Sequence, residues 1–196
     1  MSSTLEILAN LITTLSIIAA GRNSVHVWWT GIVGCSIFAL VFYSTNLYAD
    51  VVLQLFFVGA SVVGWRQWLK GDHGKPLHVT HAGRGALTWI VPVGVLATAG
   101  YGVLLHHYTN AYAPFLDSAI LVFSVIAQLL MMQRRIETWP FWLLVNSLAV
   151  PVYFSRGLTL TSVLYAGYWV NAIVSWRHWR KLADEQATAS LAEAAA

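Results

Sequence analysis

Hydrophobic residues in this chain form seven long stretches, separated by short segments that hold most of the polar and charged residues. Each stretch is close to the roughly 20 apolar residues that a helix needs to cross a bilayer. Because lipid offers no hydrogen-bonding partners, a crossing segment must satisfy its own backbone, which predicts helices. The predicted spans cover residues 5–21, 27–45, 50–69, 86–105, 113–132, 138–155 and 159–177.

The composition supports a membrane protein. Only 10% of the 196 residues are charged and 58% are hydrophobic, whereas a typical soluble domain carries about 25% charged residues. The first stretch has no basic region before it and no clear cleavage site after it, so we expect it to remain as a span. Cys35 is the only cysteine, which excludes an internal disulfide.

The basic residues define an orientation. Ten of the eleven Lys and Arg residues fall on one side of the seven predicted spans, and only Arg156 falls on the other. The positive-inside rule then predicts a protein of the bacterial inner membrane with its N-terminus outside and its C-terminus in the cytoplasm. The net positive charge is therefore a topology signal, and no nucleic-acid partner is expected. The ten residues are Arg22, Arg66, Lys70, Lys75, Arg84, Arg134, Arg135, Arg177, Arg180 and Lys181.

Two similar segments, GWRQWLK at 64–70 and SWRHWRK at 175–181, indicate an internal repeat. A shift of 111 residues aligns Trp65 with Trp176 and Trp68 with Trp179. The predicted transmembrane domain, residues 1–181, then consists of a three-helix bundle (5–69), a linker helix (86–105) and a second bundle (113–177), followed by a short cytoplasmic tail (182–196). Transporters built from parallel repeats bind substrate between them, near the middle of the membrane.

Ionisable residues are absent from the middle of every predicted span. Ion-coupled pumps usually keep such a residue at depth, and no ATP-binding motif is present, so the pattern favours a passive facilitator. A membrane enzyme would need acidic, histidine or serine groups at depth, and a receptor or assembly subunit would usually carry a larger soluble domain. A phosphorylated substrate would require buried Arg or Lys, so we expect a neutral or cationic one. No cofactor is implied.

The sixth span carries the most distinctive face. Trp139, Trp142, Asn146 and Tyr153 follow helical spacing along one side. Aromatic rings bind flat or cationic ligands, and an amide can hydrogen-bond polar groups, so this face suits a small heteroaromatic solute. The alternative is that the tryptophans anchor the helix at the interface and Asn146 joins neighbouring helices.

Other polar residues in the spans are weaker candidates for substrate binding, because each alone is better explained by helix–helix contacts. They are Gln54, Gln128, Tyr165, Tyr168 and Asn171. Asp50, Asp117 and Glu137 stand near helix starts, which favours capping, although the two outer aspartates could attract a cation. The histidines of segment 73–81 match no standard metal site, so no metal is expected.

The segment SAILVFSVIAQLLMMQRRIETWPFW, followed by Asn146, resembles the signature of the Pnu-type vitamin transporters, and LYADVVLQLFF with GWRQW resembles their third helix. The resemblance extends over nearly the whole chain; Thr138 stands where Asn is common. The signature residues are Ala127, Gln128, Leu130, Met131, Arg134, Arg135, Glu137, Trp139, Trp142 and Asn146. In the third helix they are Leu47, Tyr48, Ala49, Asp50, Gln54, Gly64, Trp65 and Trp68.

This resemblance implies a SWEET-like fold of two three-helix bundles and a substrate site that includes Trp139, Trp142, Asn146 and Gln54. It implies facilitated import of a non-phosphorylated vitamin precursor, which a cytoplasmic kinase then traps, and association into a homo-oligomer such as a trimer. Nicotinamide riboside, with its flat cationic ring and polar sugar, is the leading substrate. Thiamine is the alternative within the family, and riboflavin, being neutral and larger, fits the face less well.

Overall fold

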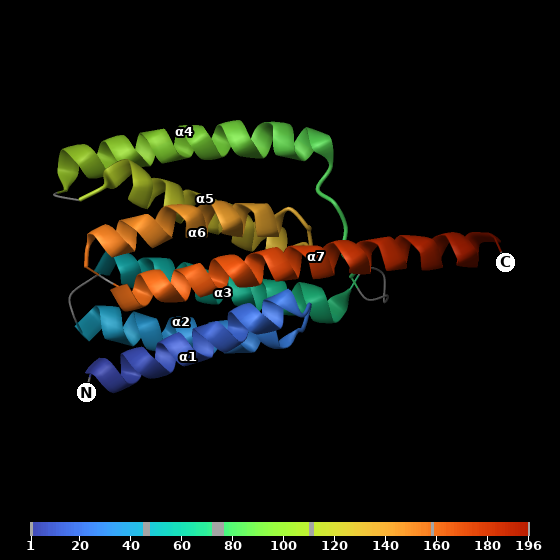
Figure 1. Cartoon of the computed structure of the whole chain (residues 1–196), viewed down its shortest axis with the longest axis horizontal. Coiled ribbons are helices and arrows are strands. Elements are labelled where there is room, and N and C mark those ends of the chain that lie inside the picture. The colour runs from blue at the N-terminus through green and yellow to red at the C-terminus, as the bar shows by residue number, and fades with distance from the viewer. Residues whose placement is uncertain (1, 45–47, 72–76, 110–111, 158, 196) are drawn as a thin grey trace. The chain divides into compact units, whose positions relative to one another are not determined.

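The computed structural model describes residues 2–44, 48–71, 77–109, 112–157 and 159–195, which form seven helices (Figure 1). Contacts divide the chain into two units, Met1–His78 and Val79–Ala196, and each is described by itself. The helices are α1 (Ser2–Gly21), α2 (His26–Ser44), α3 (Tyr48–Lys70), α4 (Arg84–Tyr108), α5 (Pro114–Met132), α6 (Thr138–Ser155) and α7 (Thr159–Ala195).

The first unit packs its three helices in chain order, α1 against α2 and α2 against α3. At the start of α2, the Ser16 hydroxyl donates to the carbonyl oxygen of Val27 at 2.8 Å. Trp28 meets Trp68 of α3 edge to face, with ring centroids 5.1 Å apart and planes at 86°. Gly64 permits this pairing, because a Cβ atom there would lie 2.5 Å from the Trp28 ring.

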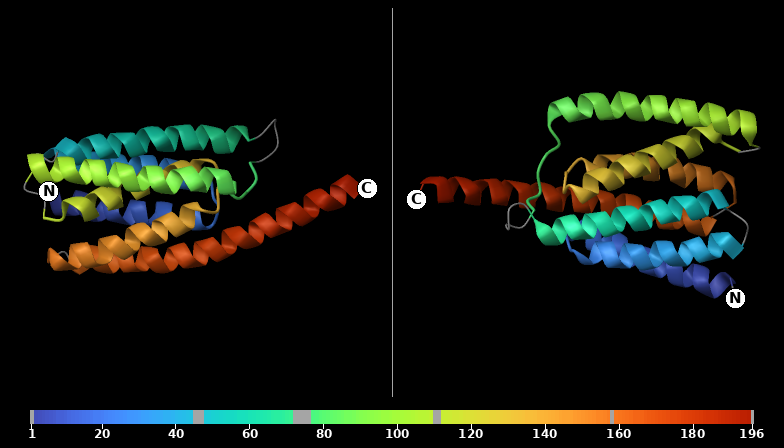
Figure 2. Two further views of the ribbon diagram at one scale, coloured as in Figure 1. Left: turned by 90° about the horizontal axis from the view of Figure 1, so that it is seen from above. Right: turned by 180° about the vertical axis from the view of Figure 1, so that it is seen from behind.

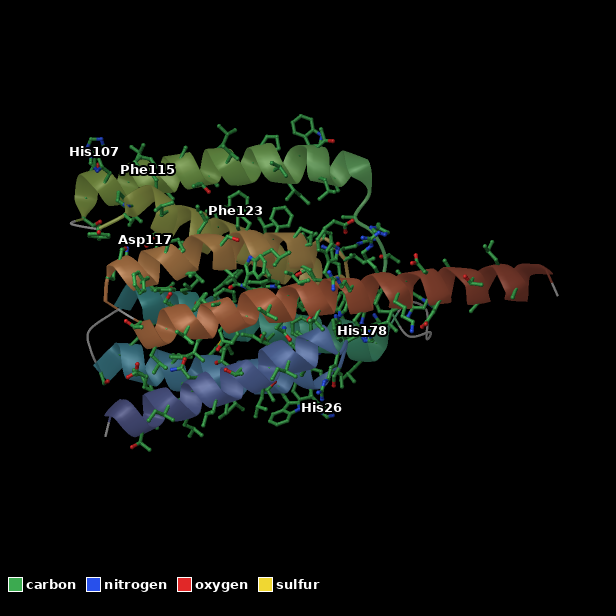
Figure 3. The ribbon with its side chains drawn as sticks, in the orientation of Figure 1. His26, His107, Phe115, Asp117, Phe123 and His178 are labelled. Carbon is green, nitrogen blue, oxygen red and sulfur yellow. The ribbon has the colours of Figure 1, made fainter. Side chains whose placement is uncertain are left out.

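The second unit continues the same sequential packing through α4, α5, α6 and α7. Its core is a cluster of buried residues, mainly on α5 and α6, that includes Phe123, Ala127 and Phe141. Phe123 and Phe115 project from α5 toward α4 (Figure 3). Gly94 lets α4 approach, since a Cβ atom there would lie 3.0 Å from the Phe123 ring.

The turn between α1 and α2 recurs between α5 and α6 at the shift of 111 residues that the sequence indicates. Asn23 and Arg134 (134 − 23 = 111) both adopt left-handed backbone, with φ of 53° and 51°. The Asn23 N–H donates to the Ala20 carbonyl at 3.0 Å, and the Arg134 N–H donates to the Met131 carbonyl at 3.0 Å. The next N–H in each turn makes a 2.9 Å bond, from Ser24 to Ala19 and from Arg135 to Leu130.

The tryptophan pair recurs at the same shift. Trp139 of α6 meets Trp179 of α7 edge to face, with centroids 5.4 Å apart and planes at 83°. The Thr138 hydroxyl donates to the Ala127 carbonyl at 2.8 Å, which joins the same two positions as the serine bond in the first unit with donor and acceptor exchanged. The predicted repeat and the all-helical, seven-helix fold are thereby confirmed.

Within the part of the chain that the structure describes, four helices are long and apolar enough to cross a membrane on length and composition alone, namely α1, α2, α4 and α5. The other three, α3, α6 and α7, carry six of the seven candidate substrate-binding residues. A helix inside a bundle needs an apolar surface only where it meets lipid. Trp, Tyr, Asn and Gln side chains are therefore compatible with helices that pack inside a bundle.

The segment predicted as a cytoplasmic tail is helical. Residues 182–195 are helical and continue α7 beyond the other helices of its unit (Figures 1 and 2). This segment is rich in Ala, the best helix former.

Candidate functional site

The predicted face of α6, here called the α6 face, consists of Trp139, Trp142, Asn146 and Tyr153. Two buried residues fix the start of this helix. Thr138 is fully buried and bonded to α5, and Trp139 is 2% exposed and packed on Trp179. Trp139 repeats the place of Trp28 in the first unit, so its contacts here are those of a packing residue. The expectation that Trp139 lines the substrate site remains a prediction.

Trp142 and Asn146 follow Trp139 on the same side of α6. Trp142 is partly buried against the Phe123 and Phe141 cluster, and Asn146 is 4% exposed. Asn146 lies eight residues into a helix of 18 residues, or about 12 Å from its start. This places an amide near the middle of the span, where a polar group is costly unless it has a partner.

A cluster of three tyrosines extends this face toward the other end of α6. Tyr153 lies 5.0 Å from Tyr165 between ring centroids, and Tyr165 lies 5.5 Å from Tyr168. The structure thus brings together Tyr165 and Tyr168, two of the predicted site residues, with Tyr153. Sequence spacing had already placed Tyr153 on the α6 face, but the contact between α6 and α7 could not be read from spacing within one helix.

The two glutamines lie in different units. Gln128 is half-buried on α5, and Gln54 is half-buried on α3. The shift of 111 residues makes Gln54 the counterpart of Tyr165, so both repeats carry a polar side chain at this position of their third helix. Within the second unit, a ring contact joins Tyr165 to Tyr168.

The ionisable residues at the helix ends have partners that the sequence did not predict. Arg156 donates to both carboxylate oxygens of Asp117, at 2.6 and 2.8 Å, and its guanidinium lies 5.6 Å from the centre of the Tyr112 ring. Asp117 is therefore neutralised locally, which removes the proposed attraction of a cation by this residue (Figure 3). The side chain of Asp50 lies outside the described residues.

Glu137 does not have the capping role that its position predicted. Its carboxylate makes no capping bond at the start of α6. It accepts instead from the Ala82 N–H at 2.7 Å and lies 2.9 Å from Nδ1 of His81. Of the histidine segment, residues 73–76 lie outside the described residues, and among those described no three His, Cys, Asp or Glu side chains converge on a metal position.

Two similar three-helix bundles and a linker helix, with many exposed apolar side chains and an aromatic and amide face at depth, define a multi-pass membrane transporter of the two-repeat class. The sequence model of the nicotinamide mononucleotide transporter family matches residues 3–181. The chain belongs to this family. It is therefore a vitamin transporter of the PnuC type and not an enzyme.

Individual relatives are similar in sequence to this chain over most of its length. The nicotinamide riboside transporter PnuC of Neisseria mucosa is 29% identical over 181 residues, covering 86% of this chain and 68% of that protein. PnuC of Escherichia coli is 23% identical over 215 residues, covering 96% and 90%. The riboflavin/roseoflavin transporter RibM of Streptomyces davaonensis is 26% identical over 183 residues, covering 89% and 83%.

A solved structure has the same fold. The crystal structure of the vitamin B3 transporter PnuC matches with a TM-score of 0.72 and 28% sequence identity, over 93% of this chain and 83% of that one. This similarity confirms the predicted family and fold class.

Proposed function

We propose that this protein imports nicotinamide riboside by facilitated diffusion across the bacterial inner membrane. The observation that carries the proposal is the face of Trp142, Asn146 and the three tyrosines, all in the second unit, in spans without an ionisable residue near their middle. The relatives named as nicotinamide riboside transporters support it.

The chemistry of the substrate fits this face. A pyridinium ring is flat and cationic, so it gains about 0.5–2 kcal/mol from each aromatic face that it meets. The ribose hydroxyls need hydrogen-bonding partners, which Asn146 and the glutamines Gln54 and Gln128 can supply. In this proposal Trp142, Tyr165 and Tyr168 contact the ring, and Trp139 supports them from behind.

Transport of a phosphorylated form is not part of the proposal. A buried phosphate requires Arg or Lys within reach, and neither occurs near the middle of any span. The imported riboside is then phosphorylated by a cytoplasmic kinase, which keeps it in the cell for NAD synthesis. The functional form in this proposal is a homo-oligomer, such as a trimer, in the lipid bilayer.

Riboflavin is the second candidate, because one relative at 26% identity is named as a riboflavin/roseoflavin transporter. Thiamine also remains open on chemical grounds, since it is a cation with flat rings. Riboflavin is neutral, so it would stack on the same rings without the charge contribution. The three vitamins therefore differ in what they gain from an aromatic face.

Calorimetric titration of the purified protein separates these candidates. Nicotinamide riboside, thiamine, riboflavin and nicotinamide mononucleotide are titrated in parallel, and uptake is followed in liposomes without an ion gradient. Binding and uptake of the riboside, with none of the mononucleotide, is the expected result. Preference for thiamine or riboflavin would overturn the substrate, and a requirement for a proton or sodium gradient would overturn the facilitator mechanism.

Two variants test the site. Asn146→Ala and Trp142→Ala should each weaken binding about tenfold or more, the equivalent of one lost buried hydrogen bond or aromatic contact. Trp89→Ala is the matched control, because Trp89 is 73% exposed on α4 and should change neither binding nor uptake. Unchanged binding in both site variants would show that the substrate lies elsewhere.

A further inference from the structure

Residues 79–82, here called the strap, lead into α4 and cross the turn between α5 and α6. The Thr80 N–H donates to the Arg134 carbonyl at 3.1 Å, and the Ile136 N–H donates to the Thr80 carbonyl at 3.0 Å. These bonds form a short parallel bridge between strap and turn. The Val79 N–H donates to Oε1 of Gln186 in the α7 extension at 2.9 Å.

Side chains reinforce the bridge from the turn. Glu137 accepts the Ala82 N–H at 2.7 Å and lies 2.9 Å from His81, while its own side chain is only 16% exposed. One guanidinium nitrogen of Arg135 donates to the Thr80 hydroxyl at 2.8 Å and to the His81 carbonyl at 2.9 Å. Hydrogen bonds to a carboxylate or from a guanidinium are stronger than those between neutral groups. The strap is therefore held by two charged side chains of the turn, Arg135 and Glu137.

The first repeat serves as an internal control for this arrangement. Its α1–α2 turn has the same left-handed residue and the same closing bonds. Within the described residues, the hydrogen bonds of positions 22–25 stay inside that helix pair. The counterpart of Glu137 is His26, whose Nδ1 accepts from Trp29 of its own helix at 2.8 Å.

The α1–α2 turn therefore forms without a strap, so a turn of this kind does not need one. The strap at the α5–α6 turn must serve another purpose. Glu137 directly precedes α6, the helix of Trp142 and Asn146, and its partner Ala82 lies two residues before α4. A single carboxylate thus joins the start of the linker helix to the start of the helix with the candidate site. We propose that Glu137 is a positioning residue, which holds α6 in place through the strap, and that this clamp stays closed throughout transport. The inference rests on the proposed site on α6.

Substitutions at Glu137 test the positioning role. In Glu137→Ala, the buried Ala82 N–H loses its acceptor, so its hydrogen exchange should accelerate about tenfold or more and vitamin affinity should fall about tenfold. Glu137→Gln keeps an acceptor for this N–H and should restore most of the affinity. Glu185→Ala, on the exposed α7 extension, is the matched acidic control and should change neither.

The affinity is measured by calorimetry on folded protein, so that a loss of stability alone does not count. Faster exchange at Ala82 with unchanged affinity would reduce Glu137 to a structural residue and overturn the proposal. If the parent protein takes up thiamine or riboflavin in place of the riboside, the proposed substrate fails, and the same comparison of variants is made with the vitamin that is carried.

A disulfide tests whether the clamp stays closed. Thr80 and Arg135 are bridge partners, and paired strands lie about 4.8 Å apart, within the range that a disulfide spans. Thr80→Cys with Arg135→Cys, in a chain with Cys35→Ala, can be oxidised in liposomes. We expect equal uptake by the oxidised and reduced forms. Uptake that stops on oxidation and returns on reduction would show that the clamp must open, which contradicts the proposal.

Discussion

Asn23 and Arg134 show how two different residues meet the same backbone requirement. Asparagine is among the few residues that tolerate left-handed backbone, whereas arginine gains nothing from it. Burial also lowers the pKa of the Arg134 guanidinium below its usual value, because desolvation disfavours the charged form. The second turn is thus the more strained of the two, and among the described residues only this turn is crossed by a strap.

We therefore expect Arg134→Asn to leave the melting temperature of the detergent-purified protein unchanged or higher. Arg134→Val should lower stability by about 1–2 kcal/mol, the cost of left-handed backbone for a side chain with a branched Cβ. Asn23→Val serves as the comparison in the first repeat. A melting temperature that falls equally in Arg134→Asn and Arg134→Val would mean that contacts of the arginine, and not its backbone, govern this turn.

At the scale of helices, the two tryptophan pairs are the firmest evidence for the repeat. Trp28 and Trp139 are 0% and 2% exposed, and each joins the second helix of its bundle to the third. The shift of 111 residues that aligns Trp68 with Trp179 also aligns Trp28 with Trp139, although the similar end segments alone do not reveal it. Alignment of whole halves, and not only of their similar ends, would have found them.

Trp28→Ala and Trp139→Ala should each destabilise the protein by about 3–5 kcal/mol, as expected for loss of a buried aromatic side chain. Gly64→Ala should cost about 1–3 kcal/mol, because the added methyl group meets the Trp28 ring. Thermal unfolding in detergent measures both, with Trp89→Ala as the exposed control. If the Trp139→Ala protein is stable but does not bind vitamin, Trp139 contacts the substrate and is not only a packing residue.

The helices, their order and the repeat could be predicted because hydrophobic length and basic residues leave strong patterns in the sequence. The α6 face was likewise predicted from helical spacing. The strap could not be, since backbone hydrogen bonds in a loop require no particular residue types. The partners of Asp117 and Glu137 were missed for a related reason: each lies on a segment distant in sequence, Arg156 for one and the strap for the other.

For the whole molecule, the outward-facing surface of each unit supports a membrane environment. Large apolar side chains are well exposed in both units, such as Leu40 at 64%, Leu96 at 71% and Leu160 at 75%, which only lipid or another protein surface would cover. Arg156, the one basic residue on the predicted outer side, is paired with Asp117. Its charge is compensated there, so it does not oppose the orientation set by the other ten.

Single cysteines in a chain with Cys35→Ala test this orientation. A cysteine at Tyr112, which is 72% exposed, should react with an impermeant maleimide added to spheroplasts. A cysteine at Gln133 should react only after the membrane is opened. The reverse pattern would invert the predicted topology, and labelling of both positions in closed spheroplasts would contradict the predicted number of spans between them.

The helical extension of α7 has a practical consequence. Its 14 residues, 182–195, reach about 21 Å beyond residue 181, where the predicted transmembrane domain ends. A continuous helix transmits rotation along its length, so a spin label or fluorophore near its tip would act as the end of a lever arm. A tilt too small to detect beside the bound vitamin would become a measurable displacement in the cytoplasm.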